Sequence, residues 1–351
     1  MDRIKEWYFI KGILIFCVIY GHINAYLTPM SLVETSNYSP TLIIRLFQMP
    51  LFVLVSGHFC KTVSTFSAYL EIWKRYLTRL GLPYISWSLI LTLIKCLVQG
   101  DFSTFLLDFR ESFGLLWFIP MLLISHFVFT TYTVILSKFR IFNRVSVLFL
   151  LIVHLIISML MYRDFCNFFF LFPFYIAGYF LKKVDIHALI GRYRWGGVSI
   201  LLLLSVIICA NLPNSWTFYQ ASNYIEVFDV QHIMFVVLRY ICYAIVTLTV
   251  LLFLFKVYTP FNRKSNGLIN RICQIGKEET LFLYLAHISL LYYTLRVFVL
   301  DNESSLLGIL GNQFVRSYII SIIVFALLVV LLTLLFKILS KSVYTKKFFI
   351  G

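Results

Sequence analysis

The chain has 351 residues, of which 61% are hydrophobic and only 13% are charged. A mean hydropathy of +0.90 excludes an ordinary soluble domain and indicates a protein that crosses a membrane several times. The net charge of +15 would suit nucleic acid, but the basic residues gather between alternate apolar runs, whereas segments 29–40 and 212–231 carry neither Lys nor Arg. We therefore interpret the charge as a topology signal and an attraction to anionic lipid head groups, with both termini cytoplasmic and no nucleic-acid partner.

Several apolar runs are long enough, or nearly so, to cross a hydrocarbon layer of about 30 Å as helices. They cover residues 8–28, 41–60, 81–98, 114–134, 145–162, 165–181, 195–211, 232–255, 280–300 and 317–338. The sequence thus predicts an all-α bundle of about ten transmembrane helices that forms a single domain over residues 1–351, with no soluble domain. The first run is longer than a cleavable signal requires, and no small-x-small cleavage site follows it.

The first run carries two ionisable residues on one face. Lys11 and His22 are eleven positions apart, which is close to three helical turns and about 16 Å along the axis. Such groups are costly in lipid and usually mark a pathway or a reaction centre. His287, which lies about two turns into the run 280–300, is the second histidine of interest. We interpret His126 and His154 as hydrogen-bonding residues between helices.

Several familiar chemistries are missing from the sequence. It contains no HExxH, no Gly-rich phosphate loop and no GxSxG motif. The seven cysteines are scattered without a CxxC pair, so they are interpreted as packing residues, and we expect neither a metal site nor a tightly bound cofactor. Trp117, near the outer end of the run 114–134, can either stack on a sugar or serve as a packing residue.

Six short motifs follow one another along nearly the whole chain. They are Lys11-x10-His22, Phe47-Gln48-Met49-Pro50 with Ser56-Gly57, Arg75 to Arg79 before Pro83-Tyr84, Leu116-Trp117-Phe118-Ile119-Pro120, Phe172-Pro173-Phe174-Tyr175 with Gly178, and Leu283-Tyr284-Leu285-Ala286-His287. In this order they resemble acyltransferase family 3, ten-helix membrane O-acyltransferases of bacteria that modify cell-surface and secreted polysaccharides.

The resemblance implies transfer of an acetyl group from acetyl-CoA to a sugar hydroxyl of a polysaccharide or its lipid-linked precursor, in the bacterial cytoplasmic membrane. It assigns His22 as catalytic base or acyl acceptor together with Lys11. The phosphates of acetyl-CoA would be held by Lys11, Lys74, Arg75 and Arg79. Substrate contacts, including a hydrogen bond to the oxyanion, would come from Ser56, Tyr84, Tyr284, Trp117 and His287.

A different class of function also fits the pattern. A transporter or flippase for a glycan, or an exporter, would likewise have many helices, prolines within them and buried histidines. A non-catalytic membrane scaffold is a third interpretation, but it leaves the ordered motifs without a purpose. Release of free CoA by the purified protein separates the enzyme from the carrier.

Overall fold

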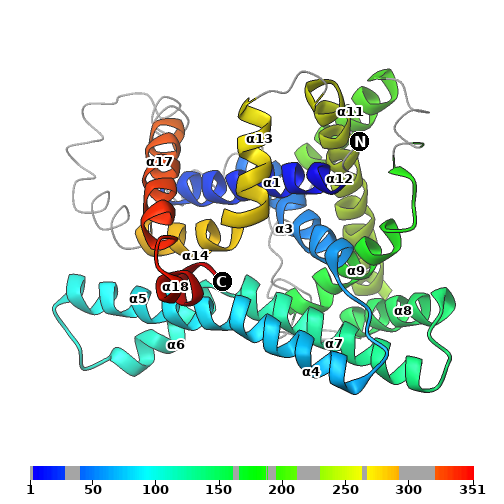
Figure 1. Cartoon of the computed structure of the whole chain (residues 1–351). Helices are drawn as coiled ribbons and strands as arrows, with labels where there is room; N and C mark the ends of the chain where they lie inside the picture. The colour runs from blue at the N-terminus through cyan, green and yellow to red at the C-terminus, as the bar shows by residue number, and fades with distance from the viewer. Residues whose placement is uncertain are drawn as a thin grey trace.

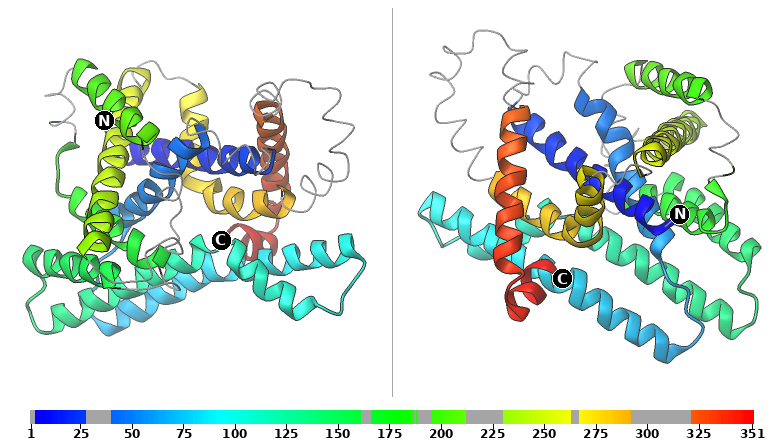
Figure 2. Two further views of the ribbon diagram at one scale, coloured as in Figure 1. Left: turned by 180° about the vertical axis from the view of Figure 1, so that it is seen from behind. Right: turned by 45° about the horizontal axis from the view of Figure 1, so that its top comes forward.

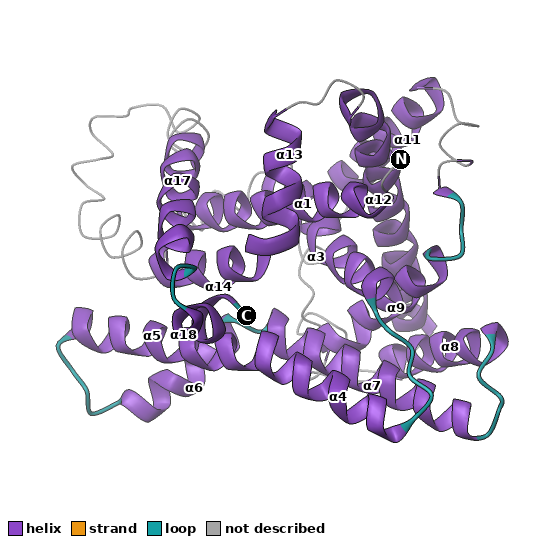
Figure 3. Ribbon diagram, viewed as in Figure 1, coloured by secondary structure: helices purple, strands orange, loops and turns teal. Residues whose placement is uncertain are grey.

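The computed structural model describes residues 3–27, 40–160, 166–186, 188, 195–211, 230–262, 267–291 and 321–351. Within these ranges every regular element is helical and no strand occurs (Figure 3), as the sequence predicted. The helices are α1 (Arg3–Leu27), α3 (Pro40–Phe59), α4 (Phe66–Tyr76), η1 (Leu77–Gly81), α5 (Leu82–Gln99), α6 (Phe105–Leu115), α7 (Phe118–Lys138), α8 (Arg144–Leu160), α9 (Cys166–Leu181), α11 (Trp195–Asn211), α12 (Val230–Asn262), α13 (Gly267–Gln274), η4 (Ile275–Glu279), α14 (Thr280–Leu290), α17 (Ser321–Leu339), α18 (Val343–Thr345) and η7 (Lys346–Ile350).

Five helical stretches in the described part of the chain are long and apolar enough to cross a membrane: Ile4–Asn24, Phe66–Gln99, Phe118–Lys138, Val237–Thr259 and Ser321–Leu339. Shorter apolar helices lie at Ile44–Phe59, Arg144–Ile156, Phe170–Leu181 and Gly196–Ser205. These lengths and compositions fit a membrane protein. The count of ten spans, the cytoplasmic termini and the single domain remain predictions, and parts of the runs 280–300 and 317–338 lie outside the described residues.

Helix α1 is the element around which the described helices assemble (Figures 1 and 2). It contacts α3, α12, α13, α14 and α17. Its side chains Ile10, Leu14, Ile15 and Ile19 are fully buried, and at about 100° per residue they span about half of the helix circumference. Lys11 and His22 lie within the same half, so burial of this side of α1 brings both residues into the bundle.

One predicted span begins earlier than the sequence suggested. The run predicted at residues 81–98 is the end of a continuous helical stretch that starts at Phe66 and includes η1, a π-helical turn. Pro83 does not interrupt it because it lies in the first turn of α5, directly after that wider turn. Helix α6 returns along α5, and α7 follows it (Figure 1).

Glycines allow two pairs of helices to touch backbone to backbone. Where α3 crosses α9, a Cβ atom on Gly57 would lie 1.9 Å from the carbonyl oxygen of Tyr175, and a Cβ on Gly178 equally close to that of Leu54. Where α1 crosses η4, a Cβ on Gly276 would lie 1.8 Å from the carbonyl oxygen of Tyr8. Small residues at such crossings are the usual device for close helix packing in membranes.

Candidate functional site

The two histidines singled out from the sequence meet across α1 and α14. His22 Nδ1 lies 2.9 Å from His287 Nε2, and the two rings stack at 5.1 Å with an angle of 25° between their planes. His287 is fully buried, whereas His22 is partly exposed. The Nδ1 atom of His287 also lies 2.8 Å from the carbonyl oxygen of Leu283. The pair therefore has one ring anchored within the bundle and one ring that belongs to a partly exposed residue.

The crossing of α1 with η4 sets the register of this pair. A Cβ atom on Gly276 of η4 would meet the backbones of Tyr8 and Gly12, and a Cβ atom on Gly12 of α1 would meet the backbone of Ile272 in α13. From that crossing, His22 is ten residues further along one helix and His287 eleven residues along the other. At 1.5 Å per residue these separations correspond to about 15 and about 16 Å, so the two side chains arrive at nearly the same level.

The wide turn of η4 is completed by local bonds. The Thr280 hydroxyl lies 3.0 Å from the Ile275 carbonyl oxygen and 3.1 Å from that of Gly276. It therefore donates its hydrogen to carbonyl oxygens of the π-helical turn. Glu279, only 1% exposed, accepts hydrogen bonds of 2.5 and 3.0 Å from the Arg271 guanidinium. A buried carboxylate requires such a partner, and this bidentate pair fixes the start of α14.

Arg45 is a site residue that sequence reasoning missed. It projects from α3 and interacts electrostatically with His22. On the same helix Gln48 is buried, and its Oε1 would lie 3.5 Å from a Cβ atom on Gly21, the residue before His22. Among the described residues Gln48 Oε1 has no hydrogen-bond partner. A lone arginine inside an apolar run is itself a signal of function, and it could have been used here.

Aromatic residues continue from the histidine pair toward α7. The edge of Tyr284 lies against His287 with ring centroids 5.8 Å apart, and Phe118 contacts Tyr284 at 5.4 Å. Trp117 follows as the neighbour of Phe118, with ring centroids 6.1 Å apart. The structure thus connects Tyr284 and Trp117, two predicted substrate-contacting residues, to the histidine pair through a line of aromatic rings.

Two other predicted substrate contacts have their hydroxyl hydrogens engaged elsewhere. Tyr84 donates to the carbonyl oxygen of Phe113 at 3.1 Å, which ties α5 to α6. Ser56 donates to the carbonyl oxygen of Phe52, one turn earlier in α3, at 2.9 Å. A hydroxyl has one hydrogen to donate, so this structure favours Tyr284 over both of them as a donor to a reacting oxygen.

The predicted phosphate-binding residues form two separate groups. Lys11 is partly exposed and directly precedes the Gly12 crossing on α1. Lys74, Arg75 and Arg79 are exposed on α4 and η1, where Arg75 pairs with Glu71 at 3.5 Å. They remain accessible to an anionic ligand.

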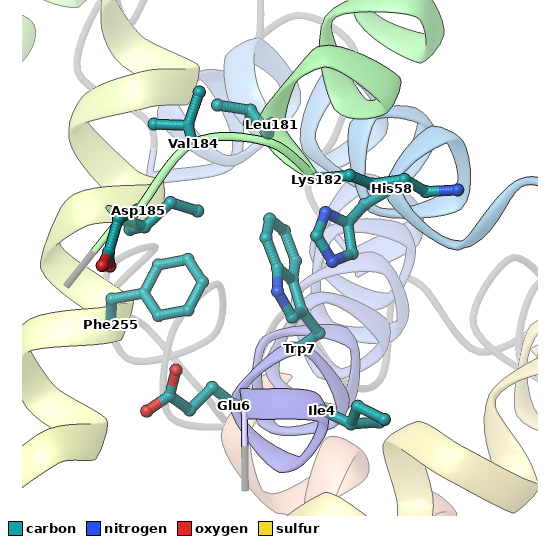
Figure 4. Close-up of a pocket in the computed structure, with 10 residues that line it drawn as sticks. Ile4, Glu6, Trp7, His58, Leu181, Lys182, Val184, Asp185 and Phe255 are labelled. Atoms are coloured by element: carbon teal, nitrogen blue, oxygen red, sulfur yellow. The ribbon is translucent and has the colours of Figure 1, made fainter. Parts of the chain in front are cut away.

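A cavity of about 140 Å³ opens beside the first turn of α1 (Figure 4). Trp7 stacks on His58 at 3.9 Å and meets Phe255 edge-on at 5.0 Å. The carboxylates of Glu6 and Asp185 lie on the Phe255 side of this cavity, while the Lys182 side chain points away and donates to the Cys60 carbonyl oxygen. Two carboxylates beside a cavity disfavour phosphate there.

Among the described residues, no group of three His, Cys, Asp or Glu side chains is arranged to hold a metal ion. The family of the chain follows from comparison with known proteins. A family model described as "Acyltransferase domain", that of acyltransferase family 3, matches residues 4–339. The chain belongs to this acyltransferase family. The resemblance drawn from the ordered motifs is thereby confirmed.

A curated relative of the chain is the nodulation protein NolL of Mesorhizobium japonicum, which is 28% identical over 218 residues. The match covers 59% of the chain and 56% of NolL, so it spans just over half of that protein. No solved structure matches the chain.

Proposed function

We propose that this membrane acyltransferase moves an acetyl group from acetyl-CoA to a hydroxyl group of a sugar, in a polysaccharide or in its lipid-linked precursor. The observation that carries the proposal is the hydrogen bond between partly exposed His22 and buried His287, within a chain that belongs to an acyltransferase family. An imidazole is the side chain best suited to take a proton from a hydroxyl near neutral pH.

In the proposed reaction, His22 accepts the hydroxyl proton while the sugar oxygen attacks the thioester carbonyl carbon. The new C–O bond forms, the C–S bond breaks, and the CoA thiolate takes the proton back from the imidazolium. Free CoA and the sugar ester are the products. If His22 instead attacks the thioester itself, an acyl-imidazole forms first and CoA leaves before the sugar arrives.

Two neighbours suit the negative charge that develops on the carbonyl oxygen. Arg45 supplies a positive charge that acts electrostatically on His22, and the ring of Tyr284 packs against that of His287. A fixed cation or a hydroxyl donor directed at this oxygen stabilises the transition state more than the ground state. The aromatic line that ends at Trp117 is the proposed contact surface for the sugar ring.

The donor would approach from the side that carries Lys11. Lys11 is about 16 Å along α1 from His22, so a molecule with anionic groups at one end and a thioester at the other can bridge the two. Lys74, Arg75 and Arg79 provide further exposed cations for its phosphates. The carboxylate-lined cavity at Trp7 is not the proposed phosphate site, because Glu6 and Asp185 would repel it.

We place the enzyme in the bacterial cytoplasmic membrane, with both termini in the cytoplasm. The distribution of Lys and Arg supports this orientation, and the relative NolL is a bacterial protein. A cytoplasmic entry for acetyl-CoA at the amino-terminal half of α1 follows from the same orientation.

The test uses purified protein in detergent with acetyl-CoA and candidate acceptor sugars. The expected result is release of free CoA that requires the acceptor, in the absence of any membrane gradient. His22→Ala, present at the same level in the membrane, should abolish this release. Unchanged acylation by His22→Ala refutes the catalytic assignment, and a protein that moves glycans without releasing CoA is a carrier.

A further inference from the structure

The hydrogen-bond partners of His287 determine where its hydrogen lies. A neutral imidazole carries one N–H group and one nitrogen with a free lone pair. His287 Nδ1 lies 2.8 Å from the carbonyl oxygen of Leu283, and a carbonyl oxygen can only accept. The ring is fully buried, where an unpaired positive charge is costly. Neutral His287 therefore has its hydrogen on Nδ1 and its lone pair on Nε2.

The bond between the two rings then determines where the hydrogen of His22 lies. His287 Nε2 lies 2.9 Å from His22 Nδ1, so the lone pair of His287 requires a hydrogen on His22 Nδ1. In its neutral form His22 then has no hydrogen on Nε2. The bond directions thus run from His22 to His287 and from His287 to Leu283, and they leave one free lone pair in the chain, on His22 Nε2.

The structure also holds His287 in this orientation. Its Nδ1 bond is to the residue four positions earlier in α14, so the ring lies along its own helix. One face stacks on His22 and its surroundings include the ring of Tyr284. A ring flip would exchange nitrogen and carbon positions and would break both bonds, which is unfavourable for a fully buried side chain.

We propose that His287 is a positioning residue that fixes the tautomer of His22, so that His22 Nε2 is the nitrogen that reacts. This inference rests on the proposed function, since it names the reacting atom of the same site. When His22 Nε2 takes the hydroxyl proton, the ring becomes an imidazolium, and its Nδ1–H bond to His287 becomes charge-assisted and stronger. His287 thus favours the protonated state without touching the substrate.

Two substitutions at position 287 separate positioning from a structural role. His287→Gln keeps an acceptor oxygen for His22 Nδ1, whereas His287→Ala removes the acceptor. We expect His287→Ala to lower kcat by about 10²- to 10⁴-fold, the range of a correctly placed proton acceptor. The KM values for donor and acceptor should change little, and His287→Gln should restore a substantial part of kcat.

His154 provides the matched control. It is a buried histidine on α8 whose Nδ1 lies 3.1 Å from the carbonyl oxygen of Leu150, again four residues earlier. His154→Ala should leave kcat close to that of the wild type. Equal losses of kcat in His154→Ala and His287→Ala would mean that both histidines are structural, and would overturn the inference.

The tautomer itself is read by nitrogen NMR of protein with ¹⁵N-labelled histidine, in which His22 is assigned by comparison with His22→Ala. The expected spectrum shows His22 with hydrogen on Nδ1 and a free Nε2, and loses this pattern in His287→Ala. A hydrogen on Nε2 of neutral His22 in the wild type overturns the inference while the proposed function stands. Full activity of His22→Ala overturns the proposed function, and the NMR result remains decisive for the tautomer.

Discussion

A single methyl group at the crossing of α1 and η4 should separate the two histidines. In Gly276→Ala the new Cβ atom would lie 1.8 Å from the carbonyl oxygen of Tyr8, 2.7 Å from its carbonyl carbon and 2.8 Å from the nitrogen of Gly12. These are backbone atoms, which cannot swing aside as a side chain does. Since a normal C···O contact is about 3.3 Å, the helices must part by roughly 1.5 Å.

That separation is large compared with the tolerance of the histidine pair. The Nδ1 to Nε2 distance is 2.9 Å, and a hydrogen bond is lost beyond about 3.5 Å. If the displacement reaches the histidines, their separation becomes about 4 Å, and misplacement of a catalytic group by 1 Å can cost about 10²-fold in rate. We expect Gly276→Ala to lose activity on this scale and about 1–3 kcal/mol of stability.

The assay is CoA release by purified Gly276→Ala, normalised to the amount of folded protein in size-exclusion chromatography. Gly114→Ala is the matched control, because a Cβ atom at Gly114 has no atom within 4 Å. It should behave as the wild type. If folded Gly276→Ala retains wild-type activity, the crossing does not set the register of the histidines and the reasoning is refuted.

Three further predictions concern stability. Tyr84→Phe removes the bond to Phe113 and should cost about 1 kcal/mol while keeping activity, measured by thermal unfolding and CoA release. Arg271→Gln leaves buried Glu279 without its cation and should cost about 3 kcal/mol or more, seen as less folded protein in membranes. Hydrogen bonds from Lys95 and Thr104 hold the pKa of Asp108 below its ordinary value. Its charged form therefore stabilises the fold at neutral pH, and this contribution is lost as the pH falls through the lowered pKa. Asp108→Asn should lower the midpoint of thermal unfolding at pH 7, and the difference in midpoint from the wild type should become smaller in acid. Equal midpoints of the two proteins at pH 7 would contradict this.

The sequence located the histidines but not their contact. Lys11 and His22 share a face because helical geometry relates residues on one helix, and that could be predicted. The pairing of His22 with His287 joins residues 265 positions apart. This pairing depends on the backbone contact of η4 with α1. The residue pattern within one helix does not show where another helix crosses it.

The same dependence on packing between helices explains where the structure differs from the sequence prediction. The helix predicted to begin at residue 81 begins at Phe66 instead, because the π-helical turn at Leu77–Gly81 joins α4 to α5 directly before Pro83. Arg45 lies in the first part of the run 41–60, and it was not among the predicted site residues. Its charge could be noticed in the sequence, but its electrostatic effect on His22 depends on the packing of α3 beside α1.

The backbone contacts of α3 with α9 at Gly57 and Gly178 limit how these two helices can move. Main-chain atoms of α3 and α9 face each other there. Because a change of side-chain rotamer cannot alter their spacing, we expect the two helices to move together as one rigid body. Arg45 and Gln48 lie on α3 and would move with this rigid body. Any larger rearrangement of the helices is therefore left to interfaces made of side chains. One such interface lies between α1 and α17, where Phe16 and Tyr20 meet Phe325 edge-on and can repack.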